Sequence, residues 1–318
     1  METIDILGVS HAYDLTAPTN FPHVLVFVHG WLLSRKYWQP LIERLSSEFQ
    51  CLAYDLRGFG DSQLAPGSDA DVVRFPYAVP SKSSQHSTSA SALSFSMSSP
   101  FSTATPSRYS LAAYAQDLAI LLKQLNIASA WLIGHSLGGS VAFWGAKQFP
   151  DCVRGIIGLN AGGGIYLKEE FERFRSAGQQ MLKLRPRWLC HVPLIDLVFT
   201  RSHVARPMNR FWGRQRLIDL VAAHEEAALG TLLDSTTEAE VHRLPQLISQ
   251  LQQPVYFIAG TQDKVMEPKY VRHLASFHSM FKGSGANVIE IPDCGHMAMV
   301  EQPDAIASQF RTILRNHP

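Results

Sequence analysis

A serine with glycines two residues away on either side stands between two segments of opposite character. Ser136 lies in the sequence Gly-His-Ser-Leu-Gly at 134–138, after the apolar run 130–133 and before the helix-like run 141–146. A strand, a sharp turn and a helix in this order hold a serine hydroxyl on a strained bend, where glycines avoid clashes with neighbouring backbone. The spacing predicts that Ser136 is a nucleophile for acyl transfer. A plain helix N-cap is the structural alternative.

A serine nucleophile needs a base, and the base needs an acid that orients it. Asp263 and His296 each follow a short apolar run that is typical of a buried strand. The carboxyl ends of parallel strands meet at one edge of a sheet, where such sites form. We therefore predict that His296 is the base and that Asp263 orients it. Asp234 and Asp293 are alternatives for the acid, because aspartate is common in turns.

Acyl transfer also needs backbone N–H groups that stabilise the oxyanion. The sequence His-Gly-Trp at 29–31 follows an apolar run, and Gly30 lets this loop approach the nucleophile. We expect the amides of Trp31 and Leu137 to be the two donors. Three neighbouring side chains are expected to line the substrate pocket: His29, His135 and Met297. The two histidines have a role in loop structure as their alternative.

Short apolar runs alternate with longer amphipathic runs along the chain, which predicts a parallel sheet with crossover helices. The expected strands are 24–28, 51–54, 130–133, 155–159, 255–259 and 288–291. The expected helices are 37–49, 111–125, 141–149, 269–281 and 303–316. Ser110 is a suitable N-cap for the second helix, and Pro303 fits the first turn of the last one.

Two segments interrupt this alternation. Between residues 81 and 107, 12 of 27 positions are serine, so the segment buries too little apolar area to offset its ordering entropy. We predict a disordered insert over 65–108, either a tolerated surface insertion or a gate to the site. Residues 162–250 are helical in pattern and are predicted to form a cap or lid. The core is then formed by 1–161 and 251–318.

The predicted cap is divided in charge. Residues 162–216 contain eleven basic and four acidic side chains, whereas 217–250 contain one basic and six acidic ones. The two halves can neutralise one another. Alternatively, arginines that alternate with aromatic residues contact an anionic amphiphile or a membrane surface.

Composition narrows the class of protein further. The chain has 318 residues, 46% of them hydrophobic, which is enough for one large domain with an inserted segment. A net charge of +1 gives no general attraction to nucleic acid. The four cysteines are scattered, and Cys294 beside His296 has no third ligand at a suitable spacing, so no metal site is expected. Without a signal peptide or an apolar run of roughly 18 residues, the expected location is the cytoplasm.

Five motifs in order resemble the α/β-hydrolase superfamily, in its branch with a helical cap. They are the segments 29–31, 54–62, 134–139, 260–263 and 295–297 with 301–303. The resemblance implies an α/β fold with an eight-stranded, mostly parallel sheet, helices on both faces and an inserted helical cap. It implies no cofactor. It also implies a triad of Ser136, His296 and Asp263, with the Trp31 and Leu137 amides as the oxyanion hole.

The expected function is that of a serine hydrolase. Relatives that open epoxides or remove halides resemble the chain but have aspartate at the elbow, so Ser136 argues against both activities. A small-molecule carboxylic ester, thioester or lactone with a sizeable apolar part is the expected substrate. Carbon–carbon bond hydrolysis and perhydrolase-like activity are alternatives on the same fold. A ligand-binding protein with residual hydrolysis and a membrane-attached scaffold are alternatives of other classes.

Overall fold

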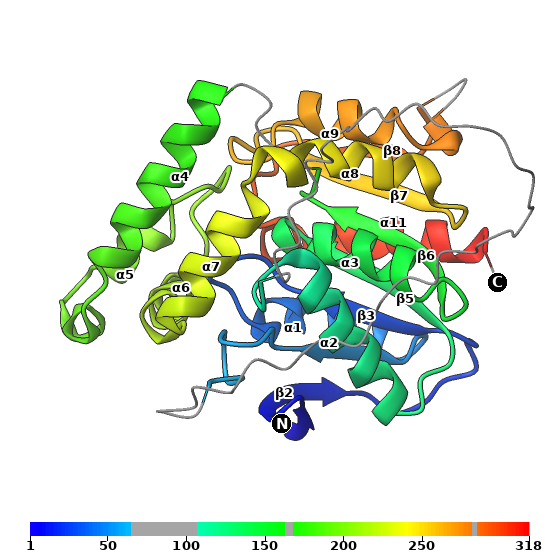
Figure 1. Ribbon diagram of the computed structural model, residues 1–318, viewed down its shortest axis with the longest axis horizontal. Helices are drawn as coiled ribbons and strands as arrows, with labels where there is room; N and C mark the ends of the chain where they lie inside the picture. The colour runs from blue at the N-terminus through cyan, green and yellow to red at the C-terminus, as the bar shows by residue number, and fades with distance from the viewer. Residues whose placement is uncertain (65–106, 163–167, 282–284, 318) are drawn as a thin grey trace, which may run out of the picture.

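A central β-sheet organises the molecule. The computed structural model describes residues 1–64, 107–162, 168–281 and 285–317. Within them lies an eight-stranded sheet of order β1-β2-β4-β3-β5-β6-β7-β8, flanked by helices (Figure 1). The Ser-rich insert predicted over 65–108 lies almost wholly outside the described residues.

The parallel part of the sheet confirms the predicted strands. It consists of β3 (Val24–Val28), β4 (Cys51–Tyr54), β5 (Ala130–His135), β6 (Val153–Leu159), β7 (Val255–Gly260) and β8 (Val288–Ile291). The inner strands β3, β4 and β5 are buried along their whole length. Strands covered on both faces read as continuous apolar runs, which is why the sequence reveals them.

An antiparallel hairpin extends one edge of the sheet and was not foreseen from the sequence. β1 (Glu2–Ile6) and β2 (Val9–Leu15) are joined by Leu7 and Gly8, both with positive φ, and β2 pairs with β4. Two central residues with positive φ are typical of the tight turns that match the twist of a hairpin. β1 is polar and mostly exposed, so it lacks the apolar run that marks the inner strands.

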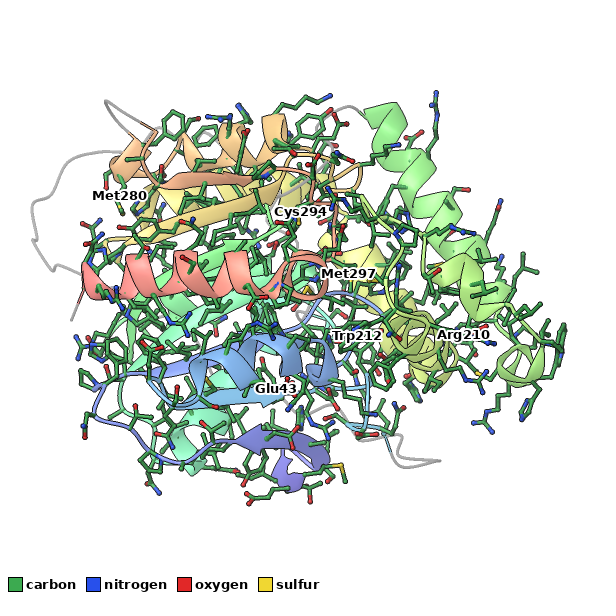
Figure 2. The ribbon with its side chains drawn as sticks, turned by 180° about the vertical axis from the view of Figure 1, so that it is seen from behind. Glu43, Arg210, Trp212, Met280, Cys294 and Met297 are labelled. Carbon is green, nitrogen blue, oxygen red and sulfur yellow. The ribbon has the colours of Figure 1, made fainter. Side chains whose placement is uncertain are left out.

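Helices cover both faces of the sheet. Alternate residues of β3 point to opposite faces, with Val26 and Val28 in one apolar core and Leu25 and Phe27 in the other. The first face carries α2 (Leu111–Gln124), α3 (Leu137–Gln148), α8 (Glu238–Gln250) and α9 (Pro268–Ala275). The second face carries η1 (Arg35–Trp38), α1 (Gln39–Leu45), α10 (Ala298–Glu301) and α11 (Pro303–Arg315). Figure 2, seen from behind, has α1 and α11 in front of the sheet.

The predicted helix signals are found where the sequence places them. The Ser110 hydroxyl accepts the Ala113 N–H at 3.3 Å at the start of α2, and Pro303 occupies the first turn of α11. The expected helix over 269–281 is shorter than predicted, because α9 ends at Ala275 and a separate turn, η3 (Ser279–Phe281), follows. None of the helices among the described residues is long and apolar enough to cross a lipid bilayer.

Between β6 and β7 the chain forms a helical segment, here called the cap helices. It consists of α4 (Lys168–Lys183), η2 (Arg187–His191), α5 (Asp196–Phe199), α6 (Arg210–Ala222), α7 (Glu225–Ser235) and α8. In Figure 1, α4, α5 and α6 stand out from one side of the sheet, whereas α8 lies across it. Leu244, Leu247 and Ile248 of α8 belong to the core cluster that includes α3 and α9. The last helix of the predicted cap therefore packs against the core.

Candidate active site

Ser136 occupies the bend between β5 and α3. Its φ of 52° and ψ of −121° lie in a region where residues other than glycine are rarely found. Its N–H donates to the Leu159 carbonyl at 3.1 Å. Such a strained conformation persists only where the surroundings impose it, and it is common at functional positions. The sequence context of Ser136 therefore produces the strained serine turn that it predicts, with the serine partly buried.

Two glycines allow the loop after β3 and the start of α3 to meet. A Cβ on Gly30 would lie 2.8 Å from the His135 ring and 3.2 Å from the Ser136 Cβ. A Cβ on Gly138 would lie 2.2 Å from the Val28 carbonyl oxygen. Any side chain at Gly138 would separate α3 from β3, so the sheet edge can carry the serine turn only with glycine there.

Asp263 and His296 meet at the carboxyl edge of the sheet. Asp263 follows β7 and His296 follows β8, and the Asp263 Oδ2 accepts a hydrogen bond from the His296 Nδ1 at 2.8 Å. Because Nδ1 carries this proton, the Nε2 of a neutral ring is free to accept one. Asp293 instead lies near Gln262 and Arg206, at an exposed position. The structure thus brings Asp263, and not Asp293, to the histidine.

The Asp263 carboxylate is held in its charged form. Burial alone would raise the pKa of Asp263, but the His296 ring, the Met266 N–H and the Asn160 amide outweigh burial and hold this pKa well below its usual range. The Val265 and Met266 N–H groups donate to Oδ1 at 2.8 and 3.0 Å. These bonds fix the carboxylate in the orientation that His296 requires.

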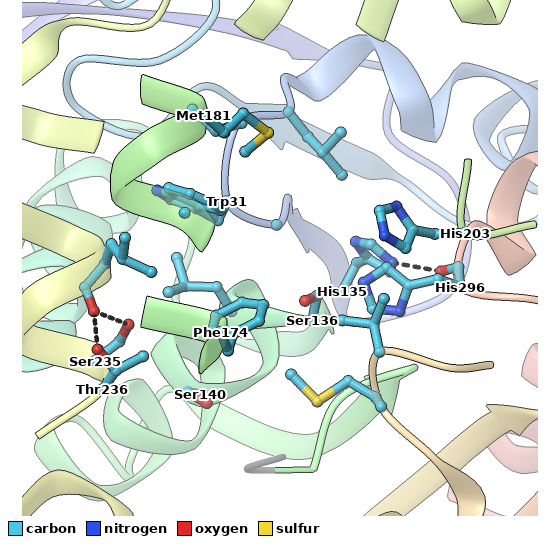
Figure 3. A pocket seen from close by; sticks show the side chains of 18 of the residues that line it. Trp31, His135, Ser136, Ser140, Phe174, Met181, His203, Ser235, Thr236 and His296 are labelled. Atoms are coloured by element: carbon cyan, nitrogen blue, oxygen red, sulfur yellow. Dashed lines mark hydrogen bonds between the residues drawn. The ribbon is translucent and has the colours of Figure 1, made fainter. Parts of the chain in front are cut away.

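The Ser136 hydroxyl and the His296 ring line the same cavity of about 390 Å³. Figure 3 shows the hydroxyl grouped with the rings of His135, His203 and His296 at one side of the pocket. Among the described residues, no hydrogen bond joins the hydroxyl to the His296 ring. Catalytic hydrogen bonds are often long in unliganded enzymes and shorten only when substrate binds.

Two backbone amides at this edge are unused. Within the described part of the chain, neither the Trp31 N–H nor the Leu137 N–H donates a hydrogen bond, and both residues line the cavity. Leu137 is the first residue of α3, where helix N–H groups lack partners and the helix dipole favours negative charge. The Trp31 indole is fixed by a 2.9 Å hydrogen bond to the Ala228 carbonyl of α7.

His135 supports the position of His296. It is fully buried, its Nε2 donates to the His296 carbonyl at 2.8 Å, and the two ring centroids are 4.8 Å apart. Burial, followed by the nearby His296, lowers the pKa of His135 to about 3. The ring is therefore neutral at physiological pH, and it lines the cavity as predicted.

The structure corrects the expectation for His29. This residue is absent from the cavity lining and is fully buried, because both ring nitrogens are bound by backbone. Nε2 accepts the Leu56 N–H at 2.9 Å, and Nδ1 donates to the Gly30 carbonyl at 2.8 Å. His29 thus joins the loops after β3 and β4, which is the structural alternative. Met297 does line the cavity.

Asn160 was not singled out in the sequence, and Glu301 was named only as part of the motif at 301–303. The Asn160 amide donates to Asp263 Oδ2 at 2.8 Å and to the Gly295 carbonyl at 3.1 Å. The Glu301 carboxylate accepts the N–H groups of Gly295 and Met297, both at 3.0 Å. Both residues hold the loop that carries His296. The position of Asn160 directly after β6 is the signal that could have revealed it, because polar residues at strand ends gather at this edge.

The cavity reaches from the sheet edge into the cap helices. Part of its apolar lining comes from α4, α6, α7 and α8: Phe174, Ala177, Met181, Leu220, Leu232, Val241 and Leu244. Among the described residues, no three histidine, cysteine, aspartate or glutamate side chains gather in a way that could hold a metal ion. Cys294 is buried, and burial raises the pKa of its thiol to about 12. It is therefore a neutral, packed thiol at physiological pH.

The alpha/beta hydrolase fold family matches residues 23–303, and the chain belongs to this family. It is 26% identical over 312 residues to the 2-succinyl-6-hydroxy-2,4-cyclohexadiene-1-carboxylate synthase of Salmonella newport (strain SL254), a match that covers 96% of this chain and 98% of that protein. A thermophilic esterase from Thermogutta terrifontis has a TM-score of 0.66 at 23% identity, with 99% of both chains covered. The enol-lactonase from Burkholderia xenovorans LB400 has a TM-score of 0.69 at 19% identity, with 99% and 100% covered. These two structures share the fold with this chain.

Proposed function

We propose that this α/β hydrolase is a serine hydrolase that cleaves a carboxylic ester, thioester or lactone of a sizeable apolar substrate. The observation that carries the proposal is the 2.8 Å bond between Asp263 and His296, beside a strained serine in one cavity. The apolar cap helices around this cavity support a substrate with a large apolar part. The esterase and the lactonase named above share the fold and are consistent with this chemistry.

In the proposed acylation step, the Nε2 of His296 takes the proton of the Ser136 hydroxyl while the oxygen bonds to the acyl carbon. The carbonyl electrons move to the oxygen, and the amides of Trp31 and Leu137 donate to this oxyanion. Asp263 stabilises the imidazolium that forms. The tetrahedral intermediate then collapses, its bond to the leaving oxygen or sulfur breaks, and His296 gives its proton to the leaving group.

Deacylation repeats these steps with water as the nucleophile. His296 takes a proton from water as the water oxygen bonds to the acyl carbon, and the same two amides stabilise the second oxyanion. Collapse breaks the bond to Ser136, which regains the proton from His296. The products are the free acid and the unchanged enzyme.

The test is the Ser136→Ala variant assayed with p-nitrophenyl esters of graded chain length. We expect kcat/KM to fall by roughly 10⁴-fold or more, because the nucleophile is lost while binding and the oxyanion donors remain. Ser249→Ala is the control, since this hydroxyl lies on the exposed side of α8 and bonds only within that helix. A fluorophosphonate should label the unmodified chain at Ser136 and leave Ser136→Ala unlabelled. Wild-type turnover by Ser136→Ala would overturn the proposal.

A second candidate is a reaction on a carbon–carbon bond. The Salmonella relative is named a synthase of a cyclohexadiene carboxylate, and it matches nearly the whole of both chains. In such a reaction the same histidine would move a proton, and Ser136 would orient the substrate. Turnover that Ser136→Ala retains and His296→Ala loses would favour this candidate over the acyl-enzyme route.

We also propose that the cap helices contact an amphiphile or a membrane surface. Trp188, Val198 and Phe211 are 64%, 63% and 60% exposed, and they lie on the elements η2, α5 and α6, of which η2 and α5 both contact α6. Exposed arginines accompany them at positions 187, 201 and 210. Apolar and basic side chains on one segment are the combination that binds anionic interfaces.

A further inference from the structure

One cationic side chain lines the cavity near the proposed base. Arg216 lies on α6 and is half-buried. Partial burial and then the Arg216 charge lower the pKa of His203, so the guanidinium lies close to that ring. The His203 carbonyl accepts the His296 N–H at 2.8 Å. Only a short stretch of chain at 202–203 therefore lies between the guanidinium and the loop of His296.

The hydrogen-bonding capacity of this guanidinium is partly unused. Its Nη1 donates to the carbonyls of Phe199, at 3.0 Å, and Ser202. Among the described residues, its Nε and Nη2 have no hydrogen-bond partner, and no carboxylate lies within ion-pair distance of it. Burial lowers the pKa of Arg216, which reflects the cost of holding the charge away from water. Nε and Nη2 together form the planar fork that matches a carboxylate.

Three other arginines between β6 and β7 have hydrogen-bond or ion-pair partners within the protein. Arg210 pairs with Asp196 at 2.6 Å, and Arg206 reaches Asp293 at 3.4 Å. Arg185 donates to the carbonyls of Leu182, Leu220 and Ala223. Arg216 differs from them because it combines a position in the cavity lining with free donors.

The charge of the described cavity lining sets the charge of the group that fits. Arg216 is the one lysine or arginine in this lining, and Glu240 is its one carboxylate. Glu240 accepts the Trp144 indole N–H and has Arg243 at 3.8 Å, so its charge is balanced outside the cavity. Glu301 lies near Arg216, but its carboxylate already accepts backbone N–H groups. Arg216 is thus the cationic side chain of the described lining that has no carboxylate at ion-pair distance, and a monoanion would supply one.

We propose that Arg216 binds a carboxylate of the substrate, so that the preferred substrates are esters that carry a free carboxylate besides the bond that is cleaved. This inference rests on the proposed hydrolysis through Ser136. The apolar lining then receives the hydrocarbon part of the substrate, and Arg216 fixes its polar end relative to the serine turn.

The experiment compares charged and neutral esters of matched length. One pair places the carboxylate in the acyl portion, with p-nitrophenyl hydrogen adipate against p-nitrophenyl hexanoate. The other pair places it in the leaving portion, with 4-(hexanoyloxy)benzoate against its methyl ester. The quantity measured is the ratio of kcat/KM for the charged ester to that for the neutral ester, in the wild type, Arg216→Gln, Arg216→Lys and Arg214→Gln. Arg214 is the matched control because it lies two residues away on α6 and is exposed.

In at least one pair we expect Arg216→Gln to lower this ratio by about tenfold or more, because a charged hydrogen-bond pair is lost. Arg216→Lys should retain part of the ratio, and Arg214→Gln all of it. Added salt should lower the wild-type ratio more than that of Arg216→Gln. An equal ratio in the wild type and Arg216→Gln, for both pairs, would overturn the inference.

Failure of the proposed hydrolysis can be told apart from failure of this inference. If neither neutral nor charged ester is cleaved, the proposed function fails. The carboxylate site is then decided by titration calorimetry of monomethyl adipate against Ser136→Ala and against Ser136→Ala with Arg216→Gln. Heat of binding that disappears only in the double variant supports the site, and equal heats in both variants overturn it.

Discussion

Neighbouring hydrogen-bond donors fix the orientation of the Asp263 carboxylate. Its two oxygens accept hydrogen bonds from one imidazole, one amide side chain and two backbone N–H groups. An acid with so many donors serves as a fixed acceptor and does not exchange protons at physiological pH. In the proposed mechanism its role is therefore to hold the tautomer of His296 that has the proton on Nδ1.

Replacing this acceptor should remove most activity. In Asp263→Asn the amide can present an N–H to His296, which favours the tautomer with the proton on Nε2 and blocks proton removal from Ser136. We expect kcat for p-nitrophenyl esters to fall by roughly 10³- to 10⁴-fold. Asp293→Asn is the control, because this exposed residue was the alternative acid in the sequence. Equal losses in the two variants, or none in either, would contradict the assignment.

For single residues, the sequence reveals the groups that are proposed to do chemistry better than the groups that hold them in place. Ser136, Asp263 and His296 stand at strand ends, and strand ends are visible as apolar runs. Asn160 acts through contacts with segments far apart in the chain, whereas Arg216 and Glu301 also bond nearby loop backbone. None of these contacts follows a spacing that marks it in the sequence. His29 was expected to line the pocket or to have a role in loop structure, and its ring has the second role, because it bonds the loop after β4.

Among the helices, α6 is attached to the sheet edge by a buried carboxylic acid. Asp219 accepts the Ser34 hydroxyl at 3.0 Å and the Gln215 amide at 2.9 Å, and it is almost completely buried. Burial raises the pKa of Asp219 to about 7, although these hydrogen bonds oppose the rise. The folded protein therefore retains a proton on Asp219 at a pH where an unfolded chain would release it.

The pH dependence of the free energy of unfolding should reveal the proton on Asp219. An unfolded aspartate has a pKa near 4, so between about pH 4 and 7 the folded state binds one more proton than the unfolded state, and Asp219 makes stability fall as pH rises. In Asp219→Asn this contribution is absent. The unfolding free energy of the wild type minus that of the variant should decrease over this range by at most about 1.4 kcal/mol per pH unit. Urea unfolding at pH 5, 6 and 7 measures it, and a constant difference would contradict it.

Among the helices and strands, hydrophobic periodicity predicts the elements that are buried on both faces and misses the elements that are half exposed. The parallel strands and the helices α2 and α11 follow the predicted ranges closely, whereas α3 begins at Leu137, before the predicted start at residue 141. The hairpin of β1 and β2 escaped because edge strands contain polar residues that also occur in loops. The expected helix over 37–49 proved to be η1 followed by α1, since helix boundaries depend on local geometry that periodicity does not resolve.

In the whole molecule, the basic and the acidic half of the cap helices lie on different helices. The basic half of the cap helices includes η2, α5 and the start of α6, and η2 and α5 both contact α6. Large apolar side chains on these three elements are exposed. The acidic half includes α7 and α8, of which α8 packs on the core. The sequence could predict the two charges but not which half would remain exposed.

This arrangement predicts binding to anionic lipid surfaces. We expect the protein to sediment with phosphatidylglycerol vesicles more than with phosphatidylcholine vesicles, and less as salt is raised, because arginines near the surface are attracted to negative headgroups. Trp188→Ala with Phe211→Ala should reduce the bound fraction several-fold, since the apolar contact is lost. Phe277→Ala is the control, because Phe277 is an exposed apolar residue outside the cap helices. Equal binding by all three proteins, or none to either vesicle, would contradict the prediction.

The junction between the loop of His296 and residues 203–205 has a consequence for protein engineering. His203 accepts the His296 N–H, Glu301 accepts the Ala205 N–H at 2.8 Å, and a Cβ on Gly295 would lie 2.6 Å from the Ala205 nitrogen. A chimera that receives its cap helices from another hydrolase would lose the contacts of this junction even if Ser136, Asp263 and His296 were retained. Grafts should therefore exchange 203–205 and 295–301 together, as one exchange unit.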